Sequence, residues 1–473
     1  MLRLFRHYIP LPALYLALVE ALALFGLLNL VTGLPGSEPS AALTSYEAAA
    51  LPSLMTVAAC LTMSSLGLYD RNVFLHLPAV VTRLLITIPL IAVVFLAIAS
   101  AYGALRDTGC QPCYGLSMIG LATYLPLAVA IRGLFIKVVD LEAFRRRILV
   151  VGSGDRAARI DRLAKDGLRR DFVVVGYVRC GEPEVEAEAD STLSPVLPAD
   201  LLTTRNRLAE LVALRRIDEI VIATRERRGL PVRELLDCRM LGARVTDYHS
   251  FWEVEAGEVV LEDLPPSWFI FSDGFRMDWV RRAVKRALDI VVSGSFLVFT
   301  LPITIPAALA IRLTSSGPVL FRQERVGLRG RTFDVLKFRT MRTDAEKNGP
   351  QYARVGDTRA TAVGRFLRRS RIDEIPQAVN VLKGDMSFIG PRPERPVFVD
   401  ILAERIPYYA ERHRVKPGIT GWAQVNYPYG ASEEDARRKL AFDLYYLKNG
   451  GLFLDIVILV QTVRVILLHE GSR

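Results

Sequence analysis

Hydrophobic residues gather into long blocks in the first third of the chain. Four apolar stretches, at residues 11–32, 48–69, 79–102 and 115–138, alternate with polar connections. Each is long enough for a helix to cross about 30 Å of hydrocarbon at about 1.5 Å per residue. The pattern predicts a four-helix transmembrane region over residues 1–140.

The charges in the connections indicate an orientation. Arg3 and Arg6 precede the first stretch, and the connection after it has no Lys or Arg. Several basic residues lie at the end of the fourth stretch or after it: Lys137, Arg145, Arg146 and Arg147. The positive-inside rule therefore places the N-terminus and the chain after residue 140 in the cytoplasm. No small-residue cleavage site follows the first stretch, so we interpret it as a helix rather than a secretory signal.

Residues 146–250 change to short apolar strands alternating with helices, which predicts a Rossmann-like α/β domain. Gly152 and Gly154 follow the first strand, where glycines let a phosphate approach a helix N-terminus. The same glycines suit tight packing of a strand against a helix. No acidic residue ends the second strand, where it would hold a ribose. A bound nucleotide and a structural or regulatory role both stay open.

Residues 251–280 contain aromatic residues and a Pro265–Pro266 break, and we interpret them as a linker to a third unit, 281–473. Residues 287–311 are almost wholly apolar, yet Pro302 and Pro306 interrupt them and both flanks are basic. Proline removes a helix hydrogen bond and bends the chain, and both flanks favour the cytoplasmic face. The pattern predicts a re-entrant helix with its break at Pro302.

The composition agrees with a membrane protein that also has polar domains. The 473 residues are 51% hydrophobic and 23% charged, and the mean hydropathy is +0.26. A net charge of +10 suits an anionic membrane face or phosphate-bearing substrates, and with these apolar blocks we expect no nucleic acid partner. Five cysteines make no disulfide framework, and the pair Cys110 and Cys113 is interpreted as a periplasmic loop feature whose role is open.

The densest pattern of charges lies between Phe321 and Gln424. Adjacent Asp373 and Glu374 stand among basic residues: Arg365, Arg368, Arg369, Arg371, Lys383 and Arg392. Phosphoryl transfer between two anions needs cationic clamps, a divalent metal and a nucleophile. A carboxylate pair can hold Mg²⁺ and attack phosphorus. A solvated ion-pair face has the same composition, so the residues alone leave both readings open.

Four further features have structural or functional interpretations. Lys337 is expected to contact a phosphate or to pair with a carboxylate. Trp422 suits a packed core better than a stack on uracil. Tyr408 and Tyr409 are assigned to the membrane boundary. The apolar tail, Leu452–Leu468, carries polar residues and is expected to lie at the membrane interface.

Five motifs stand in a characteristic order after residue 280. They are KR-x-x-D at 285–289, KFRTM at 337–341, DEIPQ at 373–377, KGDMSFIGPRP at 383–393 and KPGITGWAQVN at 416–426. In this order they resemble the polyprenyl-phosphate glycosyl-1-phosphate transferases, the bacterial sugar transferase family. The larger members also have four N-terminal helices and a Rossmann-like domain. The opening residues are similar to members associated with exosortase/PEP-CTERM exopolysaccharide systems.

The resemblance implies a two-step reaction in the bacterial inner membrane, with the catalytic domain on the cytoplasmic side. Asp373 matches the nucleophile that attacks the β-phosphate of a UDP-sugar and expels UMP, after which a polyprenyl phosphate attacks the intermediate. Glu374 matches the Mg²⁺-binding carboxylate. Arg368 and Arg392 match phosphate contacts, and Pro302 matches the break in the re-entrant helix.

Two departures and two rival functions accompany this resemblance. Leu301 stands where some members have serine, and Tyr427 where many have glycine. A membrane-bound oxidoreductase or epimerase would need a Tyr-x-x-x-Lys motif after Ala157, and none lies at a suitable distance. A non-catalytic scaffold of a polysaccharide assembly complex would tolerate Asp373→Asn. The sugar, the lipid chain length and any homo-oligomer stay open.

Overall fold

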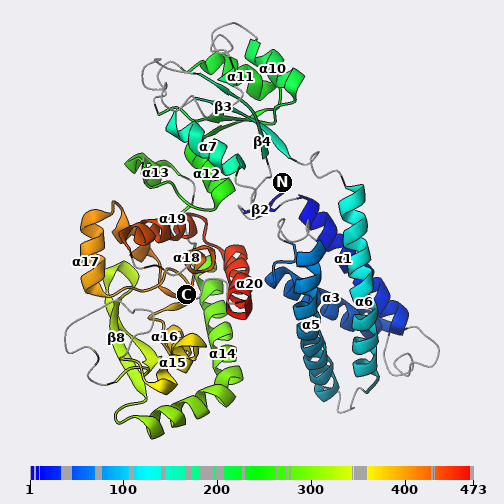
Figure 1. Cartoon of the computed structure of the whole chain (residues 1–473), viewed down its shortest axis with the longest axis vertical. Coiled ribbons are helices and arrows are strands. Elements are labelled where there is room, and N and C mark those ends of the chain that lie inside the picture. Colours follow the sequence, from blue (N-terminus) through cyan, green and yellow to red (C-terminus); the bar gives the residue numbers. More distant parts are fainter. Residues whose placement is uncertain are drawn as a thin grey trace. The chain divides into compact units, whose positions relative to one another are not determined.

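The chain divides into two compact units, residues 1–256 and 257–473, in the computed structural model (Figure 1). The structure describes residues 2–4, 7–9, 11–32, 45–69, 77–105, 111–139, 145–152, 154–165, 172–179, 196–197, 207–225, 230–262, 264–272, 274–275, 278–342, 345, 359–427, 430 and 432–468. Cys110 lies outside these residues.

The first unit contains a helical part in which four helices match the four apolar stretches. After a short hairpin, β1 (Leu2–Leu4) with β2 (His7–Ile9), come α1 (Leu11–Thr32), α3 (Ser45–Ser65), α5 (Leu77–Leu105) and α6 (Gln111–Val138). Apolar side chains from all four pack into one core, among them Leu28, Met55, Phe95 and Tyr124. A fully buried ion pair joins α6 to α1, because Arg132 donates to both oxygens of Glu20 at 2.5 and 2.8 Å. Within the described residues, Pro12–Leu30 and α14 of the second unit have the length and composition of membrane-crossing helices.

The first unit also contains a five-stranded parallel sheet. Its strands are β3 (Arg146–Val151), β4 (Phe172–Val178), β5 (Val196–Leu197), β6 (Glu219–Ile222) and β7 (Arg244–Asp247). Their order, β5-β4-β3-β6-β7, is the order that begins a Rossmann sheet. In Figure 1, α10 (Arg207–Arg215) and α11 (Val232–Met240) lie on one side of the sheet, and α7 (Asp155–Lys165) and α12 (Tyr248–Ala256) on the other. A parallel sheet with the strand order expected of a Rossmann-like domain is therefore present.

The second unit is mostly helical, with two small two-stranded sheets. The strands β8 (Leu320–Val326) and β9 (Thr332–Phe338) pair antiparallel, and β10 (Ser387–Ile389) pairs parallel with β11 (Gly418–Thr420). The helices and 3₁₀ turns are α13 (Pro266–Phe271), α14 (Trp279–Thr314), η1 (Leu328–Gly330), α15 (Ala362–Arg369), η2 (Ile372–Glu374), α16 (Gln377–Lys383), α17 (Pro396–Arg405), η3 (Tyr409–Arg414), α18 (Trp422–Asn426), α19 (Glu433–Asn449) and α20 (Leu452–Leu468).

The segment assigned to a linker is packed structure instead. Residues 251–256 are part of α12. Several residues after them belong to the core of the second unit. Val259, Leu264 and Trp268 are buried there, and the Val259 N–H donates to the Ala441 carbonyl at 3.1 Å. Aromatic side chains and prolines, which suggested a loose connection, serve here as core residues.

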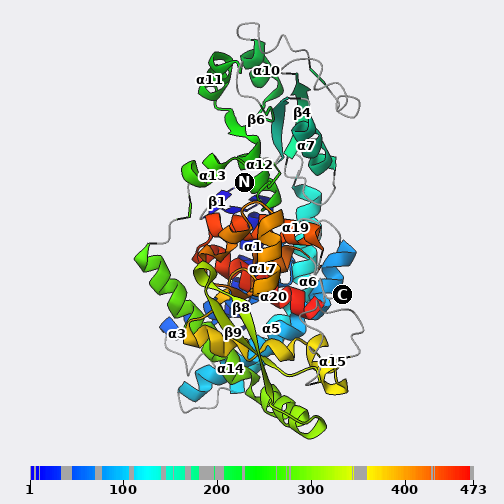
Figure 2. The same ribbon diagram turned by 90° about the vertical axis from the view of Figure 1, so that its left-hand side faces the viewer.

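Helix α14 is long, apolar and largely uncovered by its own unit. Its 36 residues include Pro302 and Pro306, and Figures 1 and 2 both show its ribbon changing direction. Phe299 and Leu313 are 80% and 76% exposed. Such a surface is costly in water, so α14 needs an apolar environment outside the unit.

Helix α20 packs one side against the second unit and exposes apolar residues such as Leu452 and Ile456 on the other. Leu454 and Ile458 are buried in the core of the second unit. The acidic residue Asp455 is also buried, and it accepts a hydrogen bond from the Tyr446 hydroxyl at 2.8 Å and pairs with Lys285 at 3.0 Å. The polar positions of this helix are thus explained in part by contacts within the protein.

Candidate active site

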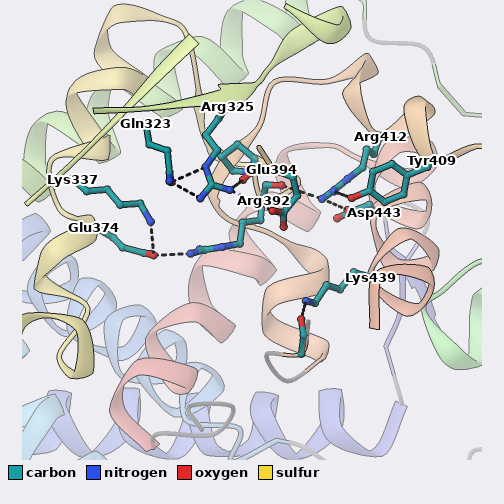
Figure 3. Close-up of polar contacts among 12 residues, drawn as sticks. Gln323, Arg325, Lys337, Glu374, Arg392, Glu394, Tyr409, Arg412, Lys439 and Asp443 are labelled. Carbon is teal, nitrogen blue, oxygen red and sulfur yellow. Dashed lines mark hydrogen bonds and ion pairs between the residues drawn. The ribbon is translucent and has the colours of Figure 1, made fainter. Parts of the chain in front are cut away.

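Charged side chains converge where β9, η2 and the turn after β10 meet (Figure 3). Lys337 comes from β9, and Asp373 and Glu374 come from η2. Arg392 comes from the turn that follows β10. Residues up to 55 positions apart in the sequence, 337 to 392, thereby form one site.

Local backbone chemistry turns the two carboxylates toward this site. Helix α15 begins at a cap in which the Thr361 hydroxyl accepts from the Gly364 N–H at 2.9 Å. The helix stops before Arg371, whose φ of +59° is left-handed. That reversal separates α15 from η2, so Asp373 is buried while neighbouring Arg369 and Ser370 stay exposed.

Glu374 is held by three cations through one oxygen. Its Oε1 lies 2.7 Å from Arg392 Nη2, 3.4 Å from Lys337 Nζ and 3.9 Å from Arg371 Nη1. Burial acts to raise the pKa of Glu374, but the charges of Arg392 and Lys337 outweigh it and hold the pKa well below its usual range. Glu374 is therefore ionised at any physiological pH.

Asp373 has the opposite environment. Burial, and next the negative charge of Glu374, raise its pKa to about 6, although Lys337, Arg368 and Arg392 pull it down. Within the described residues, the Asp373 carboxylate accepts no hydrogen bond. A desolvated carboxylate without donors keeps its lone pairs available for attack on an electrophile.

The donor set allows Mg²⁺ only in company with substrate oxygens. Within the described residues no group of three His, Cys, Asp or Glu side chains is placed to hold a metal. Two adjacent carboxylates are present, and the contacts of Glu374 with cations all fall on Oε1. Mg²⁺ is usually bound by one or two carboxylates together with phosphate oxygens and water, so Asp373 and Glu374 fit it in that way.

The turn that carries Arg392 is held by two further arginines that the motif analysis missed. Arg412 donates to the Arg392 carbonyl at 3.0 Å and pairs with buried Asp443 at 2.8 Å. Arg325 donates to the next carbonyl, that of Pro393, at 3.0 Å. Figure 3 shows Arg325 and Arg412 close to Arg392. Their positions in the sequence gave no signal, because their partners lie 20 and 68 residues away.

The KR-x-x-D motif joins α14 to this framework. Arg286 donates to the Val381 and Leu382 carbonyls at 2.6 and 2.7 Å, at the end of α16. Asp289 accepts from the Ser387 hydroxyl and the Phe388 N–H, at 2.9 and 3.0 Å. The motif is thus an anchor that positions the helix.

The contacts of the other predicted residues agree with some of the expectations and contradict one of them. Lys337 pairs with a carboxylate in this structure, and Arg368 acts on Asp373 through its charge. Trp422 stacks on Tyr445 and donates to the Gly257 carbonyl at 2.7 Å, in agreement with a packed aromatic. Tyr409 is 3% exposed and accepts from Arg412, which corrects its assignment to the membrane boundary.

The glycines of the Rossmann-like domain have a structural explanation. Gly152 has a φ of +121°, and a Cβ there would lie 3.2 Å from the main chain of Ala223 and Thr224. A glycine is required for that close approach whether or not a nucleotide binds. A Cβ on Gly154 would meet no atom within 4 Å, so packing does not explain this second glycine.

The second unit combines a proline-interrupted apolar helix with two adjacent carboxylates set among cations, which are groups that phosphoryl transfer requires. Residues 280–469 match the family described as "Bacterial sugar transferase". The "UDP-glucose:undecaprenyl-phosphate glucose-1-phosphate transferase" of Caulobacter vibrioides is 45% identical over 192 residues, which cover 40% of this chain and 71% of that protein. The chain belongs to the bacterial sugar transferase family.

Two other relatives match this chain over similar lengths. The "UDP-N-acetylgalactosamine-undecaprenyl-phosphate N-acetylgalactosaminephosphotransferase" of Aeromonas hydrophila is 48% identical over 190 residues, 40% of this chain and 45% of that protein. The "UDP-glucose:undecaprenyl-phosphate glucose-1-phosphate transferase" of Escherichia coli is 42% identical over 186 residues, 39% of this chain and 40% of that protein. The match therefore spans less than half of these two relatives.

Proposed function

We propose that this chain transfers a sugar-1-phosphate from a UDP-sugar to undecaprenyl phosphate, releases UMP, and so initiates a surface polysaccharide. The observation that carries the proposal is the contrast between the two carboxylates. Glu374 is neutralised by three cations, while Asp373 is desolvated and has no hydrogen-bond donor among the described residues. The names of the family relatives support the same donor and acceptor classes.

In the first step, an Asp373 oxygen attacks the β-phosphorus of the UDP-sugar. The bond from that phosphorus to the bridging oxygen breaks, UMP leaves with this oxygen, and a sugar-phosphoryl-aspartate forms. Arg392 and Lys337 lie beside the carboxylates, where their charges stabilise the extra negative charge of the transition state. Glu374 would hold Mg²⁺, which supplies further positive charge when it is bound.

In the second step, a phosphate oxygen of undecaprenyl phosphate attacks the same phosphorus. The bond between phosphorus and the Asp373 oxygen breaks, the carboxylate is restored, and an undecaprenyl diphosphate sugar is released. The ionised acceptor needs no general base. Arg368, which lies close enough to lower the pKa of Asp373, is the cation we assign to this incoming charge.

We further propose that α14 enters the inner leaflet of the bacterial inner membrane, bends at Pro302 and returns to the cytoplasmic side. Its exposed apolar surface and the basic residues at both ends support this placement. Trp279→Cys and Ser316→Cys should both react with a membrane-impermeant maleimide in inverted membrane vesicles, and neither should react in intact spheroplasts. Labelling of the two positions from opposite sides would mean a spanning helix.

The test of the reaction uses purified full-length protein in nanodiscs with Mg²⁺, undecaprenyl phosphate and a panel of UDP-sugars, including UDP-glucose and UDP-N-acetylgalactosamine. We expect UMP release with one donor, and none from the Asp373→Asn variant. Intact-mass analysis without acceptor should show the sugar-phosphoryl adduct on the wild type. Release of UDP would mean an ordinary glycosyl transfer, and no nucleotide product from any donor would favour a scaffold.

A further inference from the structure

Asn380 lies in the middle of α16, and its side-chain amide bonds the edge of β9 as a neighbouring strand would. The side chain is buried, with the residue 1% exposed. Its Oδ1 accepts from the Leu336 N–H at 2.9 Å, and its Nδ2 donates to the Asp334 carbonyl at 2.7 Å. An N–H and a C=O two residues apart on one edge are the groups that a neighbouring strand would pair with. The amide therefore holds β9 by its edge beside α16.

The same residue also holds the turn that leads to Arg392. The main-chain carbonyl of Asn380 accepts from the N–H groups of Gly384, Asp385 and Met386, at 3.0, 3.1 and 3.3 Å. That turn leads into β10 and then to Arg392. Asn380 thus contacts β9, which supplies Lys337, and the turn that leads through β10 to Arg392. Its own helix begins three residues after Glu374.

We propose that Asn380 is a positioning residue for the reaction under Proposed function, and that it acts by fixing β9 so that Lys337 reaches Glu374. Lys337 follows Leu336 directly, and its Nζ lies 3.4 Å from Glu374 Oε1. That distance is near the limit for a hydrogen bond, so a small displacement of β9 breaks the contact. Nothing in the five motifs singles out this role, since it depends on a contact across 44 and 46 residues.

The competing explanation is that Asn380 only stabilises the fold. A double-mutant cycle separates the two, because residues that act through one another are not additive whereas independent sites are. The variants are Asn380→Leu, which removes both amide bonds at similar volume, Lys337→Met, and the double variant. Val381→Ala is the matched control, since Val381 is fully buried on the same helix and packs against Val335 without bonding the edge of β9.

The cycle is measured by UMP release from full-length protein in nanodiscs. We expect Asn380→Leu to lower kcat by roughly 10- to 100-fold with little change in KM for the donor. In the Lys337→Met background, Asn380→Leu should lower kcat by less than about twofold. Val381→Ala should change kcat by the same factor in both backgrounds. An equal loss from Asn380→Leu in both backgrounds would overturn the proposal. If that variant does not fold, Asn380→Asp, which keeps the oxygen that accepts from the Leu336 N–H, takes its place in the cycle.

A second readout does not depend on catalysis. The amine of Lys337 is acylated competitively at increasing pH, and its reactivity is read from peptide masses. Asn380→Leu should increase the reactivity of Lys337 several-fold relative to Val381→Ala, because the amine loses its contact with Glu374. Unchanged reactivity would overturn the positioning role even in an active enzyme. Absence of UMP release from the wild type would refute the proposed function, while a change in reactivity would still support the fixing of Lys337 by Asn380.

Discussion

Replacing the proposed nucleophile should stabilise the protein while abolishing its activity. The pKa of Asp373 is raised from 3.8 to about 6, first by burial and then by Glu374. A raised pKa means that the fold favours the protonated carboxyl. The stabilisation that comes from protonated Asp373 is therefore complete below pH ~4 and is lost as the pH rises through about 6. A difference of roughly two pH units corresponds to about 3 kcal/mol. At pH 7.5 the ionised carboxylate costs the folded state up to about that amount.

The neutral amide of Asp373→Asn removes this cost. We expect the free energy of unfolding of the second unit to increase by up to about 3 kcal/mol at pH 7.5, which is a rise in Tm of several degrees for a unit of this size. The increase should shrink as the pH falls through 6 and vanish near pH 4. Thermal unfolding followed by tryptophan fluorescence reports mainly on this unit, because Trp268, Trp279 and Trp422 lie in it and only Trp252 lies in the first unit.

Glu374→Gln is the matched control, and it should change the stability in the opposite direction. The pKa of Glu374 is held well below its usual range by Arg392 and Lys337, so its ionised form stabilises the fold above pH ~4.5 and is lost only in strong acid. Gln at this position should lower Tm at pH 7.5. Equal destabilisation by both substitutions at pH 7.5, or a gain for Asp373→Asn that does not change with pH, would refute the electrostatic reasoning.

Two further substitutions test the framework of the site. Arg412→Met leaves buried Asp443 without its cation and should cost about 3–5 kcal/mol of stability, with slower UMP release; an unchanged Tm would contradict the role of this pair. Gly364→Ala places a Cβ 1.9 Å from the Thr340 carbonyl oxygen, so α15 must move and both Tm and UMP release should fall. Gly451→Ala, whose Cβ meets no atom within 4 Å, should be close to neutral in both assays.

The two carboxylates were predictable from their motif, but their different states were not. Adjacent Asp373 and Glu374 stand in a sequence crowded with arginines, and any of these could pair with either carboxylate. In the folded chain Arg371, Arg392 and Lys337 contact Glu374, while no hydrogen-bond donor among the described residues reaches Asp373. The distinction depends on which oxygen each cation reaches, and that is a property of packing.

The pattern of apolar and polar residues by itself determined the elements with strong periodicity. The four N-terminal helices, the parallel strands near 146–151, 172–178 and 217–223, and the proline-interrupted α14 follow from side-chain spacing and from the chemistry of proline. These features are local, because each is decided by residues within one helix or strand.

Only the tertiary structure decided how distant segments meet. It placed Val259, Leu264 and Trp268 of the presumed linker in a core and Tyr409 in the interior instead of at a boundary. It also brought Asn380 and Arg412 into contact with the segments that carry the site. Each of these depends on contacts between residues that are 20 or more positions apart. Hydrophobic spacing shows which face of an element is buried, but it does not identify the partner that covers that face.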